Sequence, residues 1–324
     1  MTHPSTSPSA HPFRFGVIAE HIPSRKVLVA TAQRAEAAGY ATLLIRDHFI
    51  AEPFGDQLAP LLALMLAAAV TRTLRVGTMV IDNDYRHPVM LAKEAATLDL
   101  LSGGRLELGL GAGWARDEYA AAGMPYDAPG VRITRLAEAV RILRGLWSGE
   151  AFSFAGEHYT VAGLTNFPLP VQRPLPLLIG GGAKRMLSLA AREADIIGIL
   201  TSSVATGTLV SEVNERMPAR VAEKIGWIRD AAGNRFPAIE LSAIITLLIT
   251  DDREAVAARY ARDTAWGGVT VTDVLAMPSV FIGTVDEIAA DMRARREQFG
   301  FSYFVVSDAL LDAAAPLVAR LAGT

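Results

Sequence analysis

Residues 101–119 read LSGGRLELGLGAGWARDEY, and this stretch from Leu101 to Tyr119 is the most informative part of the chain. It begins with the turn Ser102-Gly103-Gly104, continues as a short apolar strand from Leu106 to Leu110, and ends in a glycine-rich loop that reaches Trp114. A buried strand that runs directly into glycines allows the backbone to approach a ligand closely. The stretch therefore predicts a strand end that lines a site for a flat, phosphorylated cofactor.

A dinucleotide-binding fingerprint also combines a strand with spaced glycines, but the spacing here does not fit it. Counted from Gly109, the third glycine falls at Trp114, and counted from Gly111 it falls at Arg116. No strand ending in a ribose-binding acid follows about 20 residues later. The loop alone is equally compatible with a simple tight turn, so the rest of the chain has to decide between the two.

The composition excludes several classes of function. With a net charge of -3, the chain lacks the positive charge typical of proteins that bind nucleic acid or anionic membranes. It contains no cysteine, which excludes disulfides, thiolate metal ligands and thiol catalysis, and we expect a cytoplasmic location. The apolar run over residues 58–70 is too short to span a membrane.

The beginning of the chain differs in composition from the rest. Residues 1–12, MTHPSTSPSAHP, are rich in proline, serine and threonine, and they lack the positive start and apolar segment of a signal peptide. We expect a disordered tail there, followed by a single domain over residues 13–324. A chain of this length is typical of one α/β barrel.

Short apolar segments alternate with longer helical ones along the whole chain. Strands are expected at 13–19, 40–45, 74–81, 106–110, 177–179, 195–200, 239–249 and 303–306. Helices are expected at 25–38, 57–71, 88–101, 133–147, from 185 to 193, 205–232, 252–262 and after 284, with a hairpin at 151–161 and an irregular segment at 266–278. The alternation is compatible with an open doubly wound sheet, but the number of strands and the length favour an α/β fold of the (β/α)8 TIM-barrel type with insertions.

Polar and glycine-rich clusters follow four consecutive strands. They are Asp47-His48, Asp82-Asn83-Asp84, Gly111 to Trp114, and Gly180-Gly181-Gly182. In a barrel, the carboxyl ends of all strands open on one mouth, which is where active sites lie. We therefore expect these clusters to converge.

Two of the clusters have a specific chemical interpretation. The segment from Gly180 to Arg185 joins a strand end to a helix start, where unpaired amides and the helix dipole favour a phosphate, although a flexible hinge would look similar. His48 is the natural proton donor or acceptor near neutral pH, although an Asp-His pair is often only a loop or capping feature. Because adjacent residues of an extended chain point to opposite faces, we expect Asp47 and His48 to meet different groups.

No metal site is predicted. Asp82, Asn83, Asp84 and His87 offer oxygen and nitrogen ligands, but their spacing fits a polar loop better than a metal site. Trp114 is interpreted either as a wall of the ligand pocket or as an anchor where the next helix begins.

Taken together, these motifs resemble the luciferase-like monooxygenase superfamily, and within it the F420-dependent oxidoreductases. The matching stretches are Asp47-His48-Phe49, 74–80, 87–92, 95–99, Ser102 to Arg105 with Gly109 to Trp114, 171–174, and Ile179 to Arg185 with 190–192. The resemblance is clear over residues 13–200 and looser beyond. It implies a TIM barrel with a redox cofactor, either coenzyme F420 or FMN, lying across the mouth.

The resemblance also implies roles for particular residues. Asp47 and His48 would lie beside the cofactor ring, with His48 giving or taking a proton as hydride moves. Thr78, Met79 and Val80 would form a bulge behind the ring, with a non-prolyl cis peptide between Met79 and Val80. The loop of Gly111, Ala112, Gly113 and Trp114 would line the cofactor, and Gly181, Gly182 and Ala183 would bind its phosphate.

Two positions depart from well-known members of the family. Arg46 stands where they have serine, and Trp114 stands where the sugar-phosphate dehydrogenases have a glutamate that acts as an acid. Their substrate and proton chemistry therefore cannot be carried over to this chain.

Three functions remain open from the sequence. The first is an F420-dependent oxidoreductase acting on a small organic substrate. The second is an FMN-dependent monooxygenase that receives reduced flavin from a separate reductase, and the third is a non-catalytic cofactor-binding protein. Trp114, the loop after the seventh strand and the apolar residues of 266–278 suggest an uncharged or partly hydrophobic substrate. The resemblance further implies a homodimer.

Overall fold

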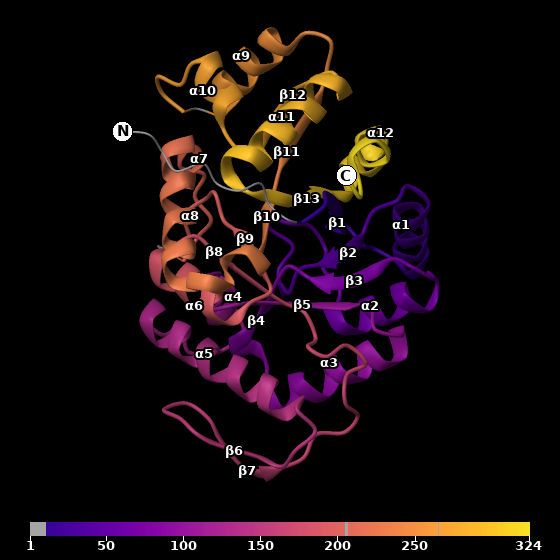
Figure 1. The fold of residues 1–324 in the computed structure, drawn as a ribbon, viewed down its shortest axis with the longest axis vertical. Coiled ribbons are helices and arrows are strands. Elements are labelled where there is room, and N and C mark those ends of the chain that lie inside the picture. The colour runs from indigo at the N-terminus through magenta and orange to yellow at the C-terminus, as the bar shows by residue number, and fades with distance from the viewer. Residues whose placement is uncertain (1–10, 205–206, 265) are drawn as a thin grey trace.

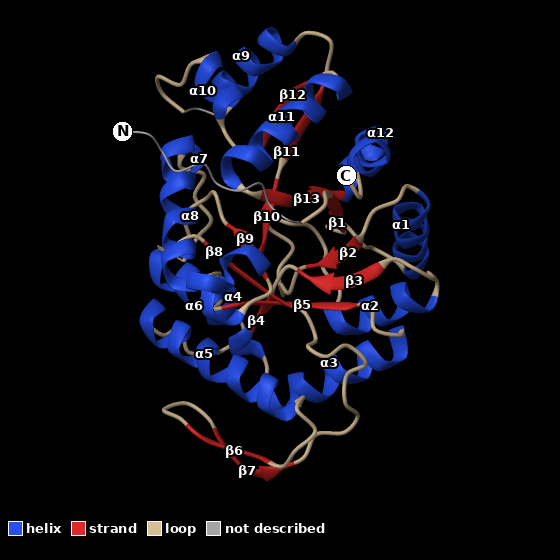
Figure 2. Cartoon of the chain, in the orientation of Figure 1, coloured by secondary structure: helices blue, strands red, loops and turns tan. Residues whose placement is uncertain are grey.

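A closed barrel of eight parallel strands forms the centre of the molecule (Figures 1 and 2). The computed structural model describes residues 11–204, 207–264 and 266–324. The barrel strands are β1 (Arg14–Ile18), β2 (Thr42–Ile45), β3 (Arg75–Thr78), β5 (Leu106–Gly111), β8 (Leu177–Gly181), β9 (Ile196–Ile199), β10 (Glu240–Ile244) and β13 (Phe301–Ser307). Their order is β3-β2-β1-β13-β10-β9-β8-β5, and pairing of β3 with β5 closes the ring. The predicted TIM barrel is confirmed, and the open sheet is excluded.

Helices cover the outside of the barrel, and local signals set where they begin. They are α1 (Arg25–Ala37), α2 (Pro60–Ala69), α3 (Pro88–Ser102), α5 (Pro129–Leu146), α6 (Lys184–Glu193), α8 (Pro218–Ala232), α11 (Val285–Phe299) and α12 (Leu311–Leu321). Four of them have proline in the first turn, where the missing amide proton costs nothing. Thr284 and Glu287 form a capping box at the start of α11, and Gly103 ends α3 in the left-handed conformation. No described helix has the length and apolar character needed to cross a bilayer.

Alternation along the strands divides the core into two layers. Val17 and Leu43 belong to the large cluster in which strands pack against helices. The adjacent Ile18 and Leu44 belong to a smaller cluster with Tyr303. Because neighbouring strand residues point to opposite faces, this smaller cluster fills the inside of the barrel.

Charged side chains close the amino-terminal end of the barrel. Arg14 forms ion pairs with Glu107 and, at 2.6 Å, with Glu240, and Arg75 pairs with Glu107 at 2.7 Å. All four residues lie at the first or second position of their strands. The opposite end of the barrel, where the strands finish, is left to the loops that carry the predicted site.

Two additions project from the barrel. The predicted hairpin is present as β6 (Phe152–Ala155) and β7 (Thr160–Leu164), which lie at the bottom of Figure 1. At the top lies a lobe in which β11 (Thr246–Ile249) and β12 (Val280–Gly283) pair in parallel beside α9 (Arg253–Asp263) and α10 (Val271–Ala276).

Several predicted elements differ from the structure. The strand expected at 239–249 is two strands, because β10 stays in the barrel while β11 pairs with β12 in the lobe. The segment expected to be irregular, 266–278, contains α10, which starts at the capping box of Thr270 and Asp273. The helix expected at 205–232 consists of the short α7 (Val213–Arg216) and α8, since Pro218 starts a new helix.

Further differences are short or lie at the edges of elements. The strand expected at 74–81 ends at Thr78, and a separate β4 (Ile81–Asp82) follows. The short α4 (Arg116–Ala121) and the terminal α12 were not predicted. Residues 205 and 206, and most of the expected tail at 1–12, lie outside the described residues.

Candidate active site

The predicted residues lie at or directly after the carboxyl ends of β2, β3, β5 and β8, so they lie at one mouth of the barrel. Contacts join several of them. The rings of His48 and Trp114 have centroids 5.6 Å apart, and the backbone amide of Asp82 donates to Asp47 Oδ2 at 3.2 Å. The peptide bond between Met79 and Val80 is cis, as expected from the resemblance.

His48 is held by a carboxylate that the sequence analysis did not identify. Its Nδ1 lies 2.9 Å from Oε2 of Glu118, a residue of α4 that is 1% exposed. Glu118 also accepts hydrogen bonds from the amides of Phe49 and Ile50, at 3.0 and 3.1 Å, and from the hydroxyl of Tyr85 at 3.0 Å. A carboxylate at Nδ1 favours the proton on that nitrogen, which leaves Nε2 of His48 as the nitrogen available to a ligand.

Asp47 serves a different group, as expected. Both of its oxygens accept from the guanidinium of Arg86, with Nη2 to Oδ1 at 3.1 Å, and Oδ2 also accepts from the amide of Asp82. Asp47 therefore ties the end of β2 to the loop after β4. Next to it, Arg46 pairs with Glu20 and lies 4.1 Å from the ring of Phe54, so this departure from the family is absorbed by an ion pair inside the protein.

The glycines of β5 and of the loop that follows it make room for the protein itself. A Cβ on Gly109 would lie 2.0 Å from the carbonyl oxygen of Thr78, and one on Gly111 would lie 2.6 Å from Cγ2 of Val80. Gly113 has φ +74, and a Cβ there would lie 1.9 Å from the hydroxyl of Tyr119. These positions need glycine because the neighbouring chain packs against them. That their backbone lines a cofactor stays a prediction.

A second buried carboxyl lies behind this loop. Asp82 accepts from the Tyr119 hydroxyl at 2.8 and 2.9 Å and from the amide of Asp84 at 2.9 Å. Burial raises the pKa of Asp82 to about 7, and burial together with Asp82 raises the pKa of Tyr119. The letters DEY at the end of the opening stretch were the only sequence signal for Glu118 and Tyr119, directly after the glycine loop.

The turn predicted to bind phosphate leads into α6. Ala183 is the N-cap residue of this helix and offers no side-chain cap to its first amides. A Cβ on Gly182 would lie 3.1 Å from the carbonyl oxygen of Leu200 and 3.5 Å from Nζ of Lys224. Lys224 is fully buried, and its Nζ pairs with Glu215 at 2.6 Å. Arg185, in contrast, donates to Thr134 of α5 at 2.8 Å, so it is directed away from the turn.

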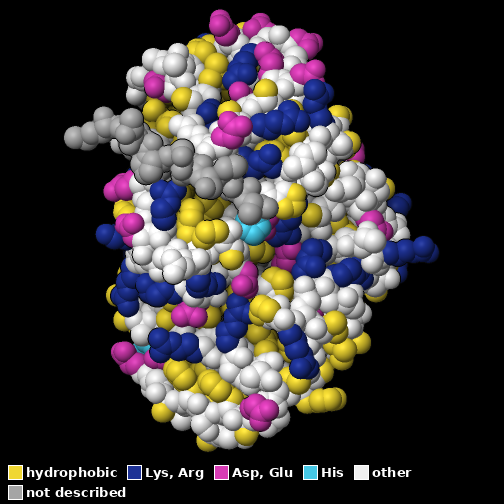
Figure 3. Space-filling view, in the orientation of Figure 1, with side chains coloured by type: hydrophobic (Ala, Val, Ile, Leu, Met, Phe, Trp, Pro, Cys, Tyr) yellow, Lys and Arg dark blue, Asp and Glu magenta, His cyan; other side chains and the backbone are white. Residues whose placement is uncertain are grey.

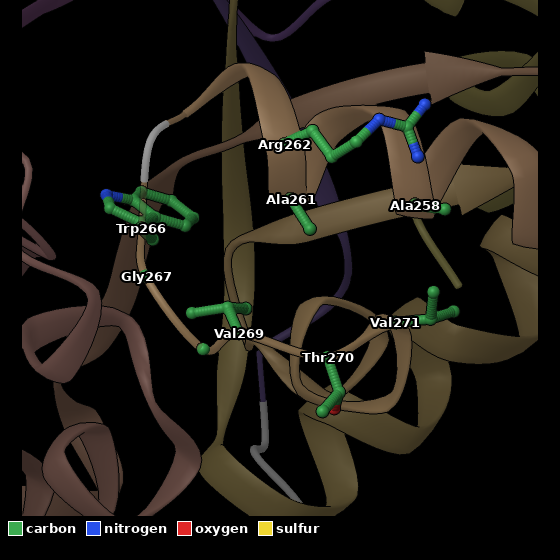
Figure 4. A pocket seen from close by; sticks show the side chains of 9 residues that line it. Ala258, Ala261, Arg262, Trp266, Gly267, Val269, Thr270 and Val271 are labelled. Atoms are coloured by element: carbon green, nitrogen blue, oxygen red, sulfur yellow. The ribbon is translucent and has the colours of Figure 1, made fainter.

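The residues expected to wall a substrate pocket lie in two groups. Trp114 contacts His48 and Phe54 at the mouth. Trp266, Val269 and Val271 line a surface pocket of about 550 Å³ on the lobe (Figure 4), and the ring of Trp266 also lies 5.5 Å from the guanidinium of Arg216. Among the described residues, no group of three or more histidine or carboxylate side chains is placed to hold a metal ion.

Residues 9–309 match the family model described as luciferase-like monooxygenase. The chain belongs to this family. An F420-dependent glucose-6-phosphate dehydrogenase of Intrasporangium calvum is 37% identical over 175 residues, which cover 52% of this chain and 52% of that protein. The chain thus spans about half the length of the curated relatives it matches.

Solved structures with the fold of this chain include two enzymes that use different cofactors or substrates by name. The coenzyme F420-dependent tetrahydromethanopterin reductase of Methanopyrus kandleri has a TM-score of 0.73 at 18% identity, covering 96% of this chain and 99% of that one. The EDTA monooxygenase of Chelativorans sp. BNC1 has a TM-score of 0.75 at 15% identity, covering 97% and 95%. At these identities the likeness shows the fold alone.

Proposed function

We propose that the protein is an F420-dependent oxidoreductase that moves hydride between the deazaflavin and a small organic substrate. The main observation behind the proposal is that the buried carboxylate of Glu118 contacts Nδ1 of His48, which leaves Nε2 available to a ligand at the barrel mouth. It is supported by the relatives whose names specify coenzyme F420.

The residues present fit a phosphorylated ring cofactor. The uncapped start of α6, with its unpaired amides, suits a phosphate at Gly181 to Ala183, and Nζ of Lys224 lies close to Gly182. Thr78, Met79 and Val80 would support the ring, and Gly111 to Trp114 would line it. When bound, the deazaflavin accepts or gives hydride at C5.

The chain's own residues would handle the proton. His48 takes up or releases it at Nε2, while Glu118 keeps the imidazole oriented. Asp47 acts indirectly, because its ion pair with Arg86 fixes the loop from which His48 projects. Trp114 and Phe54 pack on the imidazole and keep water away from it.

A second candidate function is an FMN-dependent monooxygenase, which the family description favours. It would depend on a separate reductase for reduced flavin. Titrating the purified protein with F420 and with FMN, and following the absorbance and fluorescence of each, separates the two functions. Tighter binding of FMN together with oxygen consumption would refute the F420 proposal, and binding without any turnover would indicate a non-catalytic cofactor-binding protein.

The His48→Ala variant tests the proton role. It should lose most turnover while it keeps its affinity for F420, because the side chain acts on the proton and does not hold the phosphate. His158→Ala, in the turn of the hairpin between β6 and β7, is the matched control and should keep full activity. Wild-type turnover in His48→Ala would contradict the role.

We also propose a cytoplasmic homodimer. Exposed apolar side chains stand on two adjacent helices, with Leu62 on α2 and Met90 and Leu101 on α3. On the described part of the face in Figure 3, basic, acidic and apolar side chains are interspersed. Sedimentation of the wild-type protein and of Leu62→Glu tests the dimer, which the added charge should weaken.

A further inference from the structure

The charged side chains of α7 and the start of α8 are paired, with one exception. Glu215 pairs with Lys224 at 2.6 Å and with Arg220 at 3.0 Å, and Arg220 also pairs with Glu223 at 2.5 Å. The exception is Arg216, which forms no ion pair with any residue that the structure describes.

The guanidinium of Arg216 has few hydrogen-bond partners among the described residues. Its Nη2 has one weak contact, 3.5 Å from Oγ of Ser202, and its buried Nε has no hydrogen-bond partner among the described residues. The indole of Trp266 lies 5.5 Å from the guanidinium. Burial lowers the pKa of Arg216 below its usual value, and the hydroxyl of Tyr260 only partly opposes this.

Arg105 and Arg235 also lack a carboxylate partner, but backbone carbonyls satisfy them. Arg105 donates to the carbonyl oxygens of Ser102, Leu74 and Ala68, at 2.6 to 2.8 Å. Arg235 donates to those of Ala191 and Ala194, at 2.7 and 3.0 Å. A guanidinium remains charged at all ordinary pH values, so a half-buried one without such partners is costly unless an anion completes it.

The position of Arg216 places it at the mouth of the barrel. Ser202 follows the carboxyl end of β9, two residues after Leu200, whose carbonyl oxygen accepts from Nζ of Lys224 at 2.5 Å. The same Lys224 lies beside Gly182 in the predicted phosphate turn. Arg216 therefore stands in the neighbourhood of the turn, and unlike Lys224, which pairs with Glu215, it forms no ion pair with the described residues.

We propose that Arg216, with Ser202, binds an oxyanion, a phosphate or carboxylate group, carried by a ligand at the barrel mouth. The planar guanidinium fork matches such groups, and the indole of Trp266 forms one wall of the site. The anion could belong to the substrate or to the phosphorylated part of the cofactor. If the anion belongs to the substrate, the substrate is charged, in contrast to the uncharged one that the sequence suggested. The inference rests on the proposed function and adds an anion-binding residue to the same mouth.

The anion site is tested on cofactor-free protein with inorganic phosphate and acetate, at constant ionic strength set with chloride. Thermal unfolding should show that one of the two anions stabilises the wild type, and that Arg216→Gln weakens this binding roughly tenfold or more. Arg220→Gln is the matched control, since Arg220 is already paired, and it should bind the anion as the wild type does. Arg216→Met, which keeps the aliphatic stem, is the second variant in case the first folds poorly.

The proposal is overturned if neither anion stabilises the wild type, or if both Arg216 variants are stabilised as strongly as the wild type. A flavin or deazaflavin titration then identifies the source of the anion. If Arg216→Gln weakens binding of F420 or FMN but not of the same ring without its phosphate, the anion is the cofactor's. If Arg216→Gln binds the cofactor and the phosphate-free ring as strongly as the wild type does, the anion belongs to the substrate. Failure of the proposed function would appear as no ring binding at all, and it would leave the phosphate and acetate result unaffected.

Discussion

The carboxylate of Glu118 is the most informative single group to perturb, because it holds His48 across 70 residues of chain. Oε2 of Glu118 meets Nδ1 of His48 and the hydroxyl of Tyr85, while Oε1 accepts from the amides of Phe49 and Ile50. In Glu118→Gln the remaining carbonyl oxygen can still accept from the two amides. The new amide group, a donor, then faces Nδ1 of His48.

The substitution should therefore reverse the tautomer of His48. Nδ1 becomes the acceptor and Nε2 carries the proton, so the imidazole presents the wrong nitrogen to the ligand. Correctly placed acid–base groups contribute about 10²- to 10⁴-fold to rate, so we expect kcat to fall by about 10²-fold or more. The contact with His48 is kept in the reverse direction and only the donation from the Tyr85 hydroxyl is lost, so the free energy of unfolding should fall by about 1 kcal/mol.

The assay is steady-state kinetics with F420 and any accepted substrate, combined with urea unfolding and a cofactor titration. Asp117→Asn is the matched control, because Asp117 is the exposed neighbour on the same helix and should leave kcat and stability unchanged. A Glu118→Gln protein with wild-type kcat, or one that loses only cofactor affinity, would refute the idea that Glu118 orients His48.

Three further predictions concern stability, measured by urea unfolding. Gly113→Ala should cost more than about 2 kcal/mol, because a Cβ would lie 1.9 Å from a buried tyrosine hydroxyl, whereas Gly103→Ala, at φ +71 with open space, should cost only about 1 kcal/mol. With its pKa raised from 3.8 to about 7, folded Asp82 keeps a proton that the unfolded chain releases near pH 4, so the free energy of unfolding should fall as the pH rises from 4 to 7. Asp82→Asn should abolish that fall. An unchanged slope in this variant would count against a buried neutral carboxyl. Glu107→Ala should cost about 2–3 kcal/mol, since it leaves the half-buried Arg75 without a carboxylate partner and removes one of the two partners of Arg14. The exposed Asp312→Asn should cost under about 1 kcal/mol, and equal costs would contradict this contrast.

The barrel strands are predictable from the sequence because that information is local. Each strand is a short apolar run between turn residues, and the glycine-rich stretch after residue 105 marks where one of them ends. The motifs also placed Asp47, His48 and the Gly181 turn on strand ends, and the parallel barrel then brings such ends to one mouth. The cis peptide at Met79–Val80 followed from the resemblance and was confirmed.

Errors arose where a boundary depends on distant pairing. Residues 239–249 form one apolar run, yet β10 pairs with β9 and β13 while β11 pairs with β12 in the lobe. The segment 266–278 carried no long helical period, so the capped two-turn helix α10 was missed. Local pattern gives no information on which partner a strand chooses.

Local periodicity and motif spacing are enough to predict the order of strands and helices, the glycine loops and the identity of the residues at the mouth. The contacts of each side chain, in contrast, depend on the tertiary structure. It joined Glu118 to His48, filled the space over the glycines of β5 and its following loop with Thr78, Val80 and Tyr119, and left Arg216 without an ion pair among the described residues. Hydrogen bonds, burial and charge balance depend on groups that are far apart in the chain, so they exist only once the barrel has closed.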